Sequence, residues 1–121
     1  MSRGKPKPAV VPLHHLKPGE PADFFAVLAE KARGTTRDGK PFYACRFKDR
    51  VRTVTYQVWG DGPHFPECDR DWQPGQFFKI RGVYHEHDKY GPQVEVQQLR
   101  PVRDEDRADG FREADFLDRS R

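Results

Sequence analysis

The sequence of 121 residues predicts an all-β domain, a small five-stranded Greek-key barrel. Three observations predict this fold. Five segments alternate apolar and polar residues at the two-residue spacing of strands, and turn residues close each of them. A long proline-containing break separates the third segment from the fourth, and a glycine interrupts the fourth. A chain of this length suits one compact domain with terminal extensions.

The first 21 residues are predicted to form a basic arm. They include five prolines, which favour extended backbone and leave little material for a core. The second part of the arm contains Val11, Leu13 and Leu16, which could pack against the domain. We expect the turn into the first strand at Pro18-Gly19.

Three strands are predicted in the first half of the chain. The strongest hairpin signal, Asp38-Gly39, lies between the first two of them, in a loop over residues 35–40. The first strand is predicted from Ala22 to Arg33, long enough to bend, although its alanine-rich second half also fits a helix. The second strand covers residues 42–48, and the third ends at Trp59. Alternation turns one set of side chains toward the core: Tyr43, Cys45, Phe47, Val54, Tyr56 and Val58. It turns a second set outward: Phe42, Ala44, Arg46, Lys48, Thr53, Thr55, Gln57 and Trp59.

Residues 60–75 contain three prolines and four acids, so we expect an irregular connection or one short helix. A fourth strand is predicted over residues 76–85, with Gly82 at a bulge or tight bend, and a fifth over residues 93–99. Beyond residue 102 the chain holds seven acids and five bases, and we expect most of this tail to be solvated. The predicted boundaries are an arm over 1–21, a barrel over 22–102, and a charged tail, or a linker to a downstream domain, over 103–121.

The charge is distributed unevenly along the chain. Residues 31–52 carry eight Lys or Arg and only two acids, with aromatic residues among them. Residues 1–59 hold twelve bases and five acids, whereas residues 60–121 hold ten bases and fourteen acids. Cations attract phosphates by releasing counterions, and aromatic rings stack on unpaired bases. The first half is therefore where we expect a site for a single-stranded polyanion.

Alternation selects the candidate binding residues. Phe42 and Trp59 face outward on adjacent strands and are the candidates for base stacking. The candidate phosphate ligands are outward or loop cations: Arg37, Lys40, Arg46, Lys48, Lys79, Arg81 and Lys89. The alternative is that the rings pack beneath the arm or the acidic connection, and that the cations only keep the surface soluble.

A long bent first strand and a break before the fourth are the layout of the oligonucleotide-binding (OB) fold. Within this fold, residues of about 20–103 resemble the N-terminal OB domain of the YhaM-type 3′→5′ exoribonucleases. The similar positions are Gly39-Lys40-Pro41-Phe42, Phe47, Asp49, Val58-Trp59, Phe78-Lys79-Ile80-Arg81-Gly82 and Gln93.

In that family the OB domain precedes a metal-dependent HD phosphohydrolase domain. The resemblance implies a junction near Asp115-Phe116 and a binding role for this chain, and no nuclease activity is carried over. The turn Asp49-Arg50-Val51-Arg52-Thr53 lacks the Thr-Gly of many such domains, so we expect a turn of different or wider shape. The chain is either a stand-alone module or, as we favour, a fragment of a longer protein.

Metal binding and catalysis find little support in the sequence. His14-His15, His64, Cys68 and His85-Glu86-His87-Asp88 lack the spacing of a zinc site or of a metalloprotease helix. No nucleophile, base and orienting group are grouped locally, so we expect no cofactor, no metal and no catalytic residue. Alternation places Cys45 on the inward face of its strand, with Tyr43 and Phe47, so we expect it to be a small buried apolar residue.

The remaining expectations concern location and partners. Two cysteines are too few for the disulfide framework of a small secreted domain, and no secretory signal precedes them, so we expect a cytoplasmic protein. No apolar run approaches the roughly 20 residues that span a bilayer. We expect a module that binds single-stranded RNA or DNA with low sequence specificity, RNA being favoured by the resemblance. The alternative is a protein-interaction or oligomerisation module, and an enzyme in its own right is a weaker third hypothesis.

Overall fold

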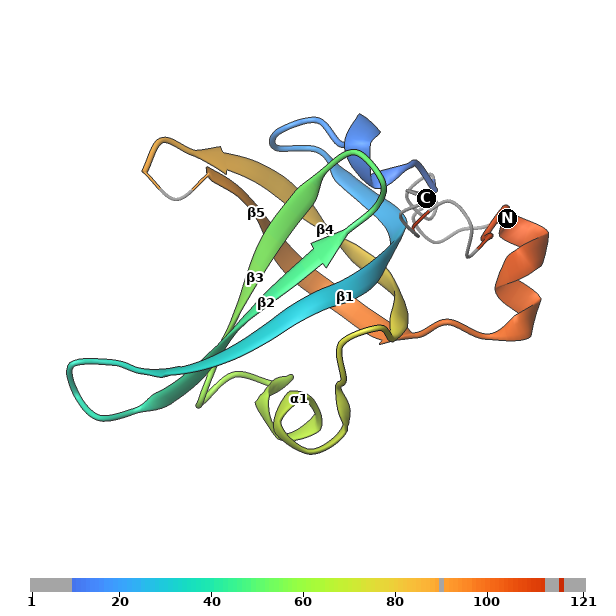
Figure 1. Ribbon diagram of the computed structural model, residues 1–121. Coiled ribbons are helices and arrows are strands. Elements are labelled where there is room, and N and C mark those ends of the chain that lie inside the picture. The colour runs from blue at the N-terminus through green and yellow to red at the C-terminus, as the bar shows by residue number, and fades with distance from the viewer. Residues whose placement is uncertain (1–9, 90, 113–115, 117–121) are drawn as a thin grey trace, which may run out of the picture.

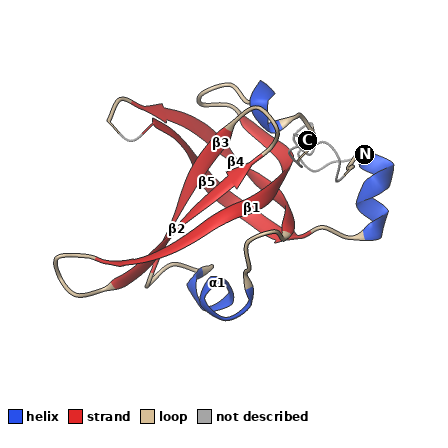
Figure 2. Ribbon diagram, viewed as in Figure 1, coloured by secondary structure: helices blue, strands red, loops and turns tan. Residues whose placement is uncertain are grey.

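The computed structural model describes residues 10–89, 91–112 and 116, and in them five strands close into a barrel. The order of strands around the barrel is β1-β2-β3-β5-β4, and β1 pairs with both β2 and β4 (Figure 1). The strands are β1 (Pro21–Thr35), β2 (Pro41–Lys48), β3 (Thr53–Trp59), β4 (Phe77–His87) and β5 (Gly91–Pro101). The helices are η1 (Leu13–His15), α1 (Phe65–Asp71) and η2 (Asp104–Asp109) (Figure 2). The predicted five-stranded OB barrel is confirmed.

Strand β1 bends so that one strand can serve two neighbours. Its first half pairs with β4 and its second half with β2, and the register shifts between Leu28 and Glu30. The helix considered for the alanine-rich second half is wrong, because the pairing of Lys31 with Cys45 and of Arg33 with Tyr43 holds that segment in the sheet.

The glycine in β4 lies at a bulge, as predicted. The pairing of β4 with β5 shifts register between Arg81 and Gly82. A Cβ atom at Gly82 would lie 2.5 Å from the carbonyl oxygen of Glu95, which is closer than real contacts allow. Only glycine therefore lets the two strands approach here.

The acidic connection between β3 and β4 forms one short helix, α1, which is the second of the two predicted possibilities. Its Cys68 and the following Trp72 are buried in the main core with Phe47 and Phe78. The Trp72 ring lies 5.3 Å from Phe78, and its indole N–H donates a hydrogen bond of 3.1 Å to Glu67. Trp72 thus attaches α1 to the barrel.

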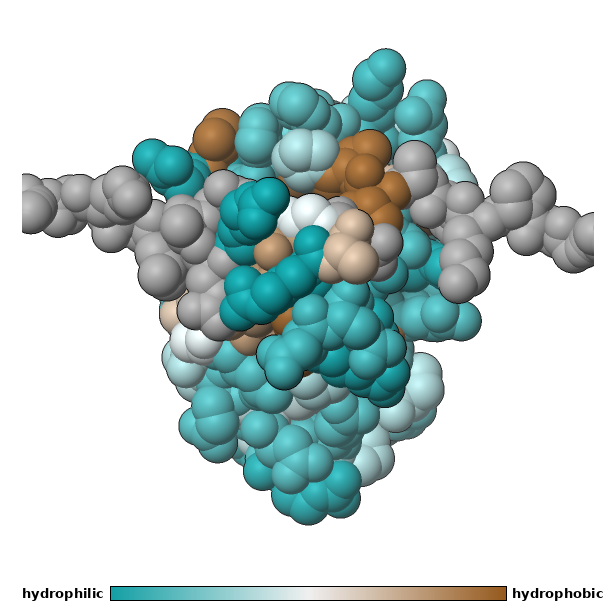
Figure 3. Space-filling view, turned by 90° about the vertical axis from the view of Figure 1, so that its right-hand side faces the viewer, coloured by the Kyte–Doolittle hydropathy of each residue, from teal (hydrophilic) through white to brown (hydrophobic). Residues whose placement is uncertain are grey.

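Segments from both ends of the chain pack against the barrel. Leu13 and Leu16 are buried in the main core cluster, and the Val11 amide donates to the Asp23 carbonyl of β1. In the charge-rich tail most described residues are exposed, but Phe111 and Phe116 are buried in a second apolar cluster that includes Phe25 of β1. Figure 3 shows this side of the molecule, with apolar patches among polar atoms.

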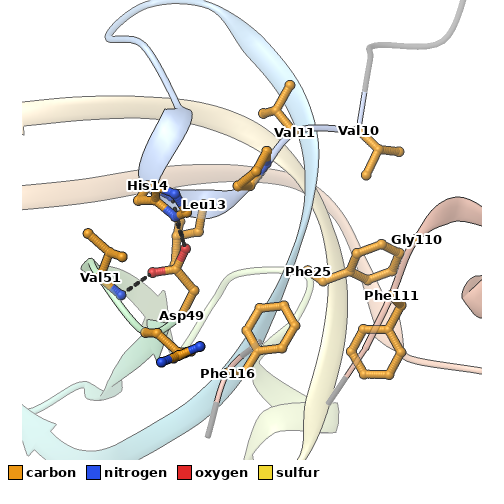
Figure 4. A pocket seen from close by; sticks show the side chains of 12 residues that line it. Val10, Val11, Leu13, His14, Phe25, Asp49, Val51, Gly110, Phe111 and Phe116 are labelled. Atoms are coloured by element: carbon orange, nitrogen blue, oxygen red, sulfur yellow. Dashed lines mark hydrogen bonds and ion pairs between the residues drawn. The ribbon is translucent and has the colours of Figure 1, made fainter. Parts of the chain in front are cut away.

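A hollow of about 570 Å³ lies between the arm, the β2–β3 turn and the tail (Figure 4). Beside it, the buried Asp49 carboxylate accepts hydrogen bonds from the His14 ring and from the amides of Val51 and Arg52. The Asp49 side chain thus organises the β2–β3 turn. None of the helices in the part of the chain that the structure describes has the length and apolar composition of a transmembrane span.

Candidate functional site

Two rings lie side by side on the outer face of β2 and β3. Phe42 and Trp59 are directly opposite in the antiparallel ladder, with ring centroids 5.4 Å apart and planes inclined by 44°. Phe42 is partly buried, whereas Trp59 is 49% exposed. An indole that is half in water keeps an open surface on which a flat ligand can stack. The alternative in which both rings are sealed is therefore wrong for Trp59.

The Phe42 ring rests on a glycine of the neighbouring strand. Gly34 of β1 is the cross-strand partner of Phe42, and a Cβ atom on it would lie 2.5 Å from the Phe42 Cζ atom. The absence of a side chain at Gly34 thus creates the space that the ring fills. Phe42 in turn supports Trp59 from the β2 side.

Several predicted cations lie on this face or at its end. Arg46 and Lys48 follow Phe42 outward along β2, and Arg46 lies roughly 14 Å from Phe42 at the rise of a strand. Arg46 is exposed and faces Glu30 at 3.8 Å, a surface pair that contributes little to stability. Arg37 and Lys40 are exposed in the β1–β2 loop, directly before Phe42. We call the outward residues Phe42, Arg46, Lys48 and Trp59 the ring face.

Arg81 and Lys79 are not brought to the ring face. They lie on β4, which is separated from β2 by β1, so their outward direction differs from that of the ring face. Arg81 makes an ion pair of 2.7 Å with the buried carboxylate of Asp23, and this hydrogen bond raises the pKa of Arg81. Lys79 lies over the Phe25 ring at 5.9 Å. Strand alternation tells inside from outside, but it cannot tell one wall of a closed barrel from another.

Lys89 is exposed in the turn between β4 and β5, where its amide donates to the His87 ring. In Figure 1 this turn and the β1–β2 loop both project toward the left of the barrel. These are the two loops that commonly flank the ligand in OB folds.

Some cations of residues 31–52 make hydrogen bonds within the domain. The Lys31 ammonium donates to the carbonyls of Cys68 at 2.5 Å and Trp72 at 3.0 Å, at the end of α1. Arg33 donates to the Tyr43 hydroxyl, which donates to Asp69, and the latter hydrogen bond raises the pKa of Tyr43. Among the described residues, no ion pair occupies Arg37, Lys40 or Lys48. The charge available to a ligand is thus smaller than the sequence count.

A groove beside Trp59 was not predicted from the sequence. Strands β3 and β5 run parallel and pair at Thr55 and Gln93, and a hollow of about 400 Å³ lies along them. We call it the β3–β5 groove; its lining includes Thr55, Gln57, Trp59, Gln93, Glu95 and Val96. Alternation had placed Gln57 outward. No local pattern reveals that β5 supplies the other wall, because that contact joins distant parts of the chain.

At one side of the groove the Tyr56 hydroxyl and the His64 Nδ1 atom are 2.7 Å apart. Burial, with smaller contributions from Cys45 and Cys68, raises the pKa of Tyr56 to about 12. The phenol therefore stays protonated at neutral pH and does not act as a base.

The residues considered for metal binding do not gather in the described part of the chain. No three His, Cys, Asp or Glu side chains there are arranged as metal ligands. Cys45 and Cys68 are buried with their sulfur atoms 3.6 Å apart. The hydrogen bond with Cys68 and burial raise the pKa of Cys45, which makes its thiol a poor nucleophile.

The closed barrel and its strand order define the chain as an OB-fold domain. It is similar to the second OB-fold domain of replication protein A from Methanococcus maripaludis, with a TM-score of 0.53 and 14% identity. It is also similar to a crystal structure of a domain of replication protein A from the same organism, with a TM-score of 0.58 and 12% identity. Each match covers 77% of this chain and 94% of the other. At this identity the likeness concerns the fold. No family model and no curated protein matches the chain.

Proposed function

We propose that this domain binds single-stranded nucleic acid across the ring face. The observation that carries the proposal is the half-exposed Trp59 indole, supported by Phe42 on the adjacent strand. OB folds of single-strand-binding proteins combine such stacking rings with a cationic path for the backbone. Every base has a flat face, so stacking of this kind tolerates any sequence.

The phosphates would follow the cations of β2 and of its preceding loop. Arg46 and Lys48 flank the rings along β2, and Arg37 and Lys40 continue the positive charge beyond Phe42. Lys89 lies on the other flanking loop. Because Lys79 and Arg81 lie on another wall, they are not needed in this binding path.

RNA as the preferred strand, and presentation of that strand to a downstream hydrolase domain, rest on the resemblance to the exoribonuclease OB domain. We include both as parts of the proposal. The role assigned to this chain is binding, without a catalytic step.

The test is a titration of a fluorescein-labelled oligo-U or oligo-A strand, read by anisotropy at several salt concentrations. Neutralisation of about four phosphates by the ring-face and loop cations predicts a slope of about −3 in the logarithm of affinity against the logarithm of salt. Trp59→Ala removes a stack worth about 1–3 kcal/mol and should weaken binding about 5- to 150-fold. Trp59→Phe should retain much of the affinity.

Arg70→Ala is a matched control, because Arg70 is exposed on α1 and pairs only with its neighbour Asp71 among the described residues. This variant should bind as the parent does. A folded domain that binds no strand at low salt would contradict the proposal and favour the interaction-module alternative. Release of product from labelled RNA would instead support the enzyme hypothesis.

A further inference from the structure

The β3–β5 groove lies on the opposite side of Trp59 from the cations of β2. In the barrel order β3 stands between β2 and β5, so the ring face and the groove share the Trp59 strand. The groove has apolar residues, Val58, Val94 and Val96, together with polar side chains from both walls. A flat ring stacked on Trp59 would have one edge directed into it.

Gln57 supplies one polar group of the groove. It is the outward residue two positions before Trp59, and its Oε1 atom is shielded from water without a hydrogen-bond partner in the described part of the chain. Unpaired buried acceptors are rare in proteins because they cost free energy. The terminal torsion of glutamine is soft, so a small turn of the amide would present this oxygen to a donor in the groove.

Glu95 supplies a second acceptor from the β5 wall. Its side chain is 75% exposed, and the Nε2 atom of the His85 ring lies 3.6 Å from its carboxylate. An ionised carboxylate accepts hydrogen bonds only, and it repels phosphate. The group that enters the groove should therefore be an N–H donor, while the phosphates stay on the β2 side.

We propose that the β3–β5 groove binds a nucleobase through an exocyclic amino group. An amino group carries two N–H bonds, which match the two acceptors, Gln57 Oε1 and the Glu95 carboxylate. Adenine, cytosine and guanine each carry such a group, whereas uracil and thymine carry carbonyl oxygens and no exocyclic amino group. This inference rests on the proposed function and adds a base preference at one nucleotide to stacking that is otherwise sequence-tolerant.

The experiment compares two labelled ten-nucleotide strands by anisotropy, one of adenosine and one of purine riboside, which has the same ring without the amino group. The fused ring and the number of phosphates are the same, so the two strands differ only in the amino group. The adenosine strand should bind at least about fivefold more tightly, the lower limit for a good two-bond contact to a base edge.

Two variants test the residues. Glu95→Ala changes an exposed side chain and should leave the fold intact, while the adenosine-to-purine ratio falls toward one. Gln57→Leu should lower the same ratio. Glu105→Ala is the matched control, since Glu105 is exposed on η2, and it should keep the parent ratio.

Equal affinity of the unchanged protein for the two strands would overturn this inference and leave the proposed function standing. A ratio that survives in both Glu95→Ala and Gln57→Leu would overturn it as well. Absence of binding to either strand would remove the proposed function and this inference together.

Discussion

Gly34 controls the position of the Phe42–Trp59 ring pair although it carries no side chain itself. Its backbone lies beneath the Phe42 ring, and Phe42 in turn contacts Trp59. The φ angle of Gly34 is not positive, so the conformation is open to other residues. What requires glycine here is space.

Gly34→Ala should therefore fold but displace the Phe42 ring, because the new Cβ atom would lie 2.5 Å from Cζ and 2.7 Å from Cε1 of that ring. Loss of part of a stack worth about 1–3 kcal/mol predicts binding weakened by roughly three- to tenfold. Anisotropy titration measures the affinity, and urea unfolding checks the stability. In a Phe42→Ala background the same glycine change should add nothing, since the coupled ring is gone. An equal loss in both backgrounds would contradict this assignment.

Strand alternation predicted single residues well where only inside and outside mattered. Tyr43, Cys45 and Phe47 are buried, and Trp59 is exposed, as the period of two requires. Alternation could not show that Arg81 pairs with Asp23, or that Gln57 faces a groove, because both depend on a strand distant in sequence.

Helix α1 is fixed to the barrel by a cation from another element. The last carbonyls of a helix have no partner within it, and the Lys31 ammonium of β1 binds the carbonyls of Cys68 and Trp72. Lys40, nine positions later, is exposed in the β1–β2 loop. The same residue type therefore serves the fold at one position and is available to a ligand at the other.

Lys31→Met should lower the free energy of unfolding by about 1.5–3 kcal/mol, the usual contribution of hydrogen bonds from a charged donor, and leave nucleic-acid affinity unchanged. Lys40→Met should do the reverse, with little change in stability and a salt slope smaller by about 0.7. Urea unfolding and anisotropy titration measure the two effects. A loss of affinity in Lys31→Met at unchanged stability would refute this division of roles.

The elements themselves were largely predictable. Gly82 marked its bulge, and the prolines between β3 and β4 marked a break in the sheet. The packing of Phe111 and Phe116 on Phe25 could not be predicted, because isolated aromatic residues in a charged segment carry no periodicity.

At the scale of the whole molecule, two buried carboxylates connect the N-terminal arm and the C-terminal tail to the barrel. Asp49 binds His14 of the arm; burial alone would raise its pKa, but the hydrogen bonds from His14, Arg52 and Val51 outweigh this and lower it. Asp106 of η2 binds Arg100 of β5, and hydrogen bonds from this arginine lower the pKa of Asp106 to about 2. Both groups stabilise the folded state when they are ionised.

The free energy of unfolding should therefore decrease as the pH falls below about 4. A carboxyl with a lowered folded pKa contributes its full stabilisation above its unfolded pKa of about 3.9 and loses it as the pH falls through about 2. Asp106→Asn should cost about 2 kcal/mol at pH 7 and roughly half of that at pH 3. Urea unfolding at both pH values measures the difference. A cost that does not depend on pH would contradict the ionised role of Asp106.

The parallel contact between β3 and β5, formed at Thr55 and Gln93, is the weakest junction in the barrel wall. Amide protons along this junction should exchange with deuterium earlier than those between β1 and β2, where eight residue pairs hold the strands. A ligand that contacts both Trp59 and Glu95 would hold β3 and β5 together. Ligand binding should therefore slow amide exchange along this junction and raise the melting temperature.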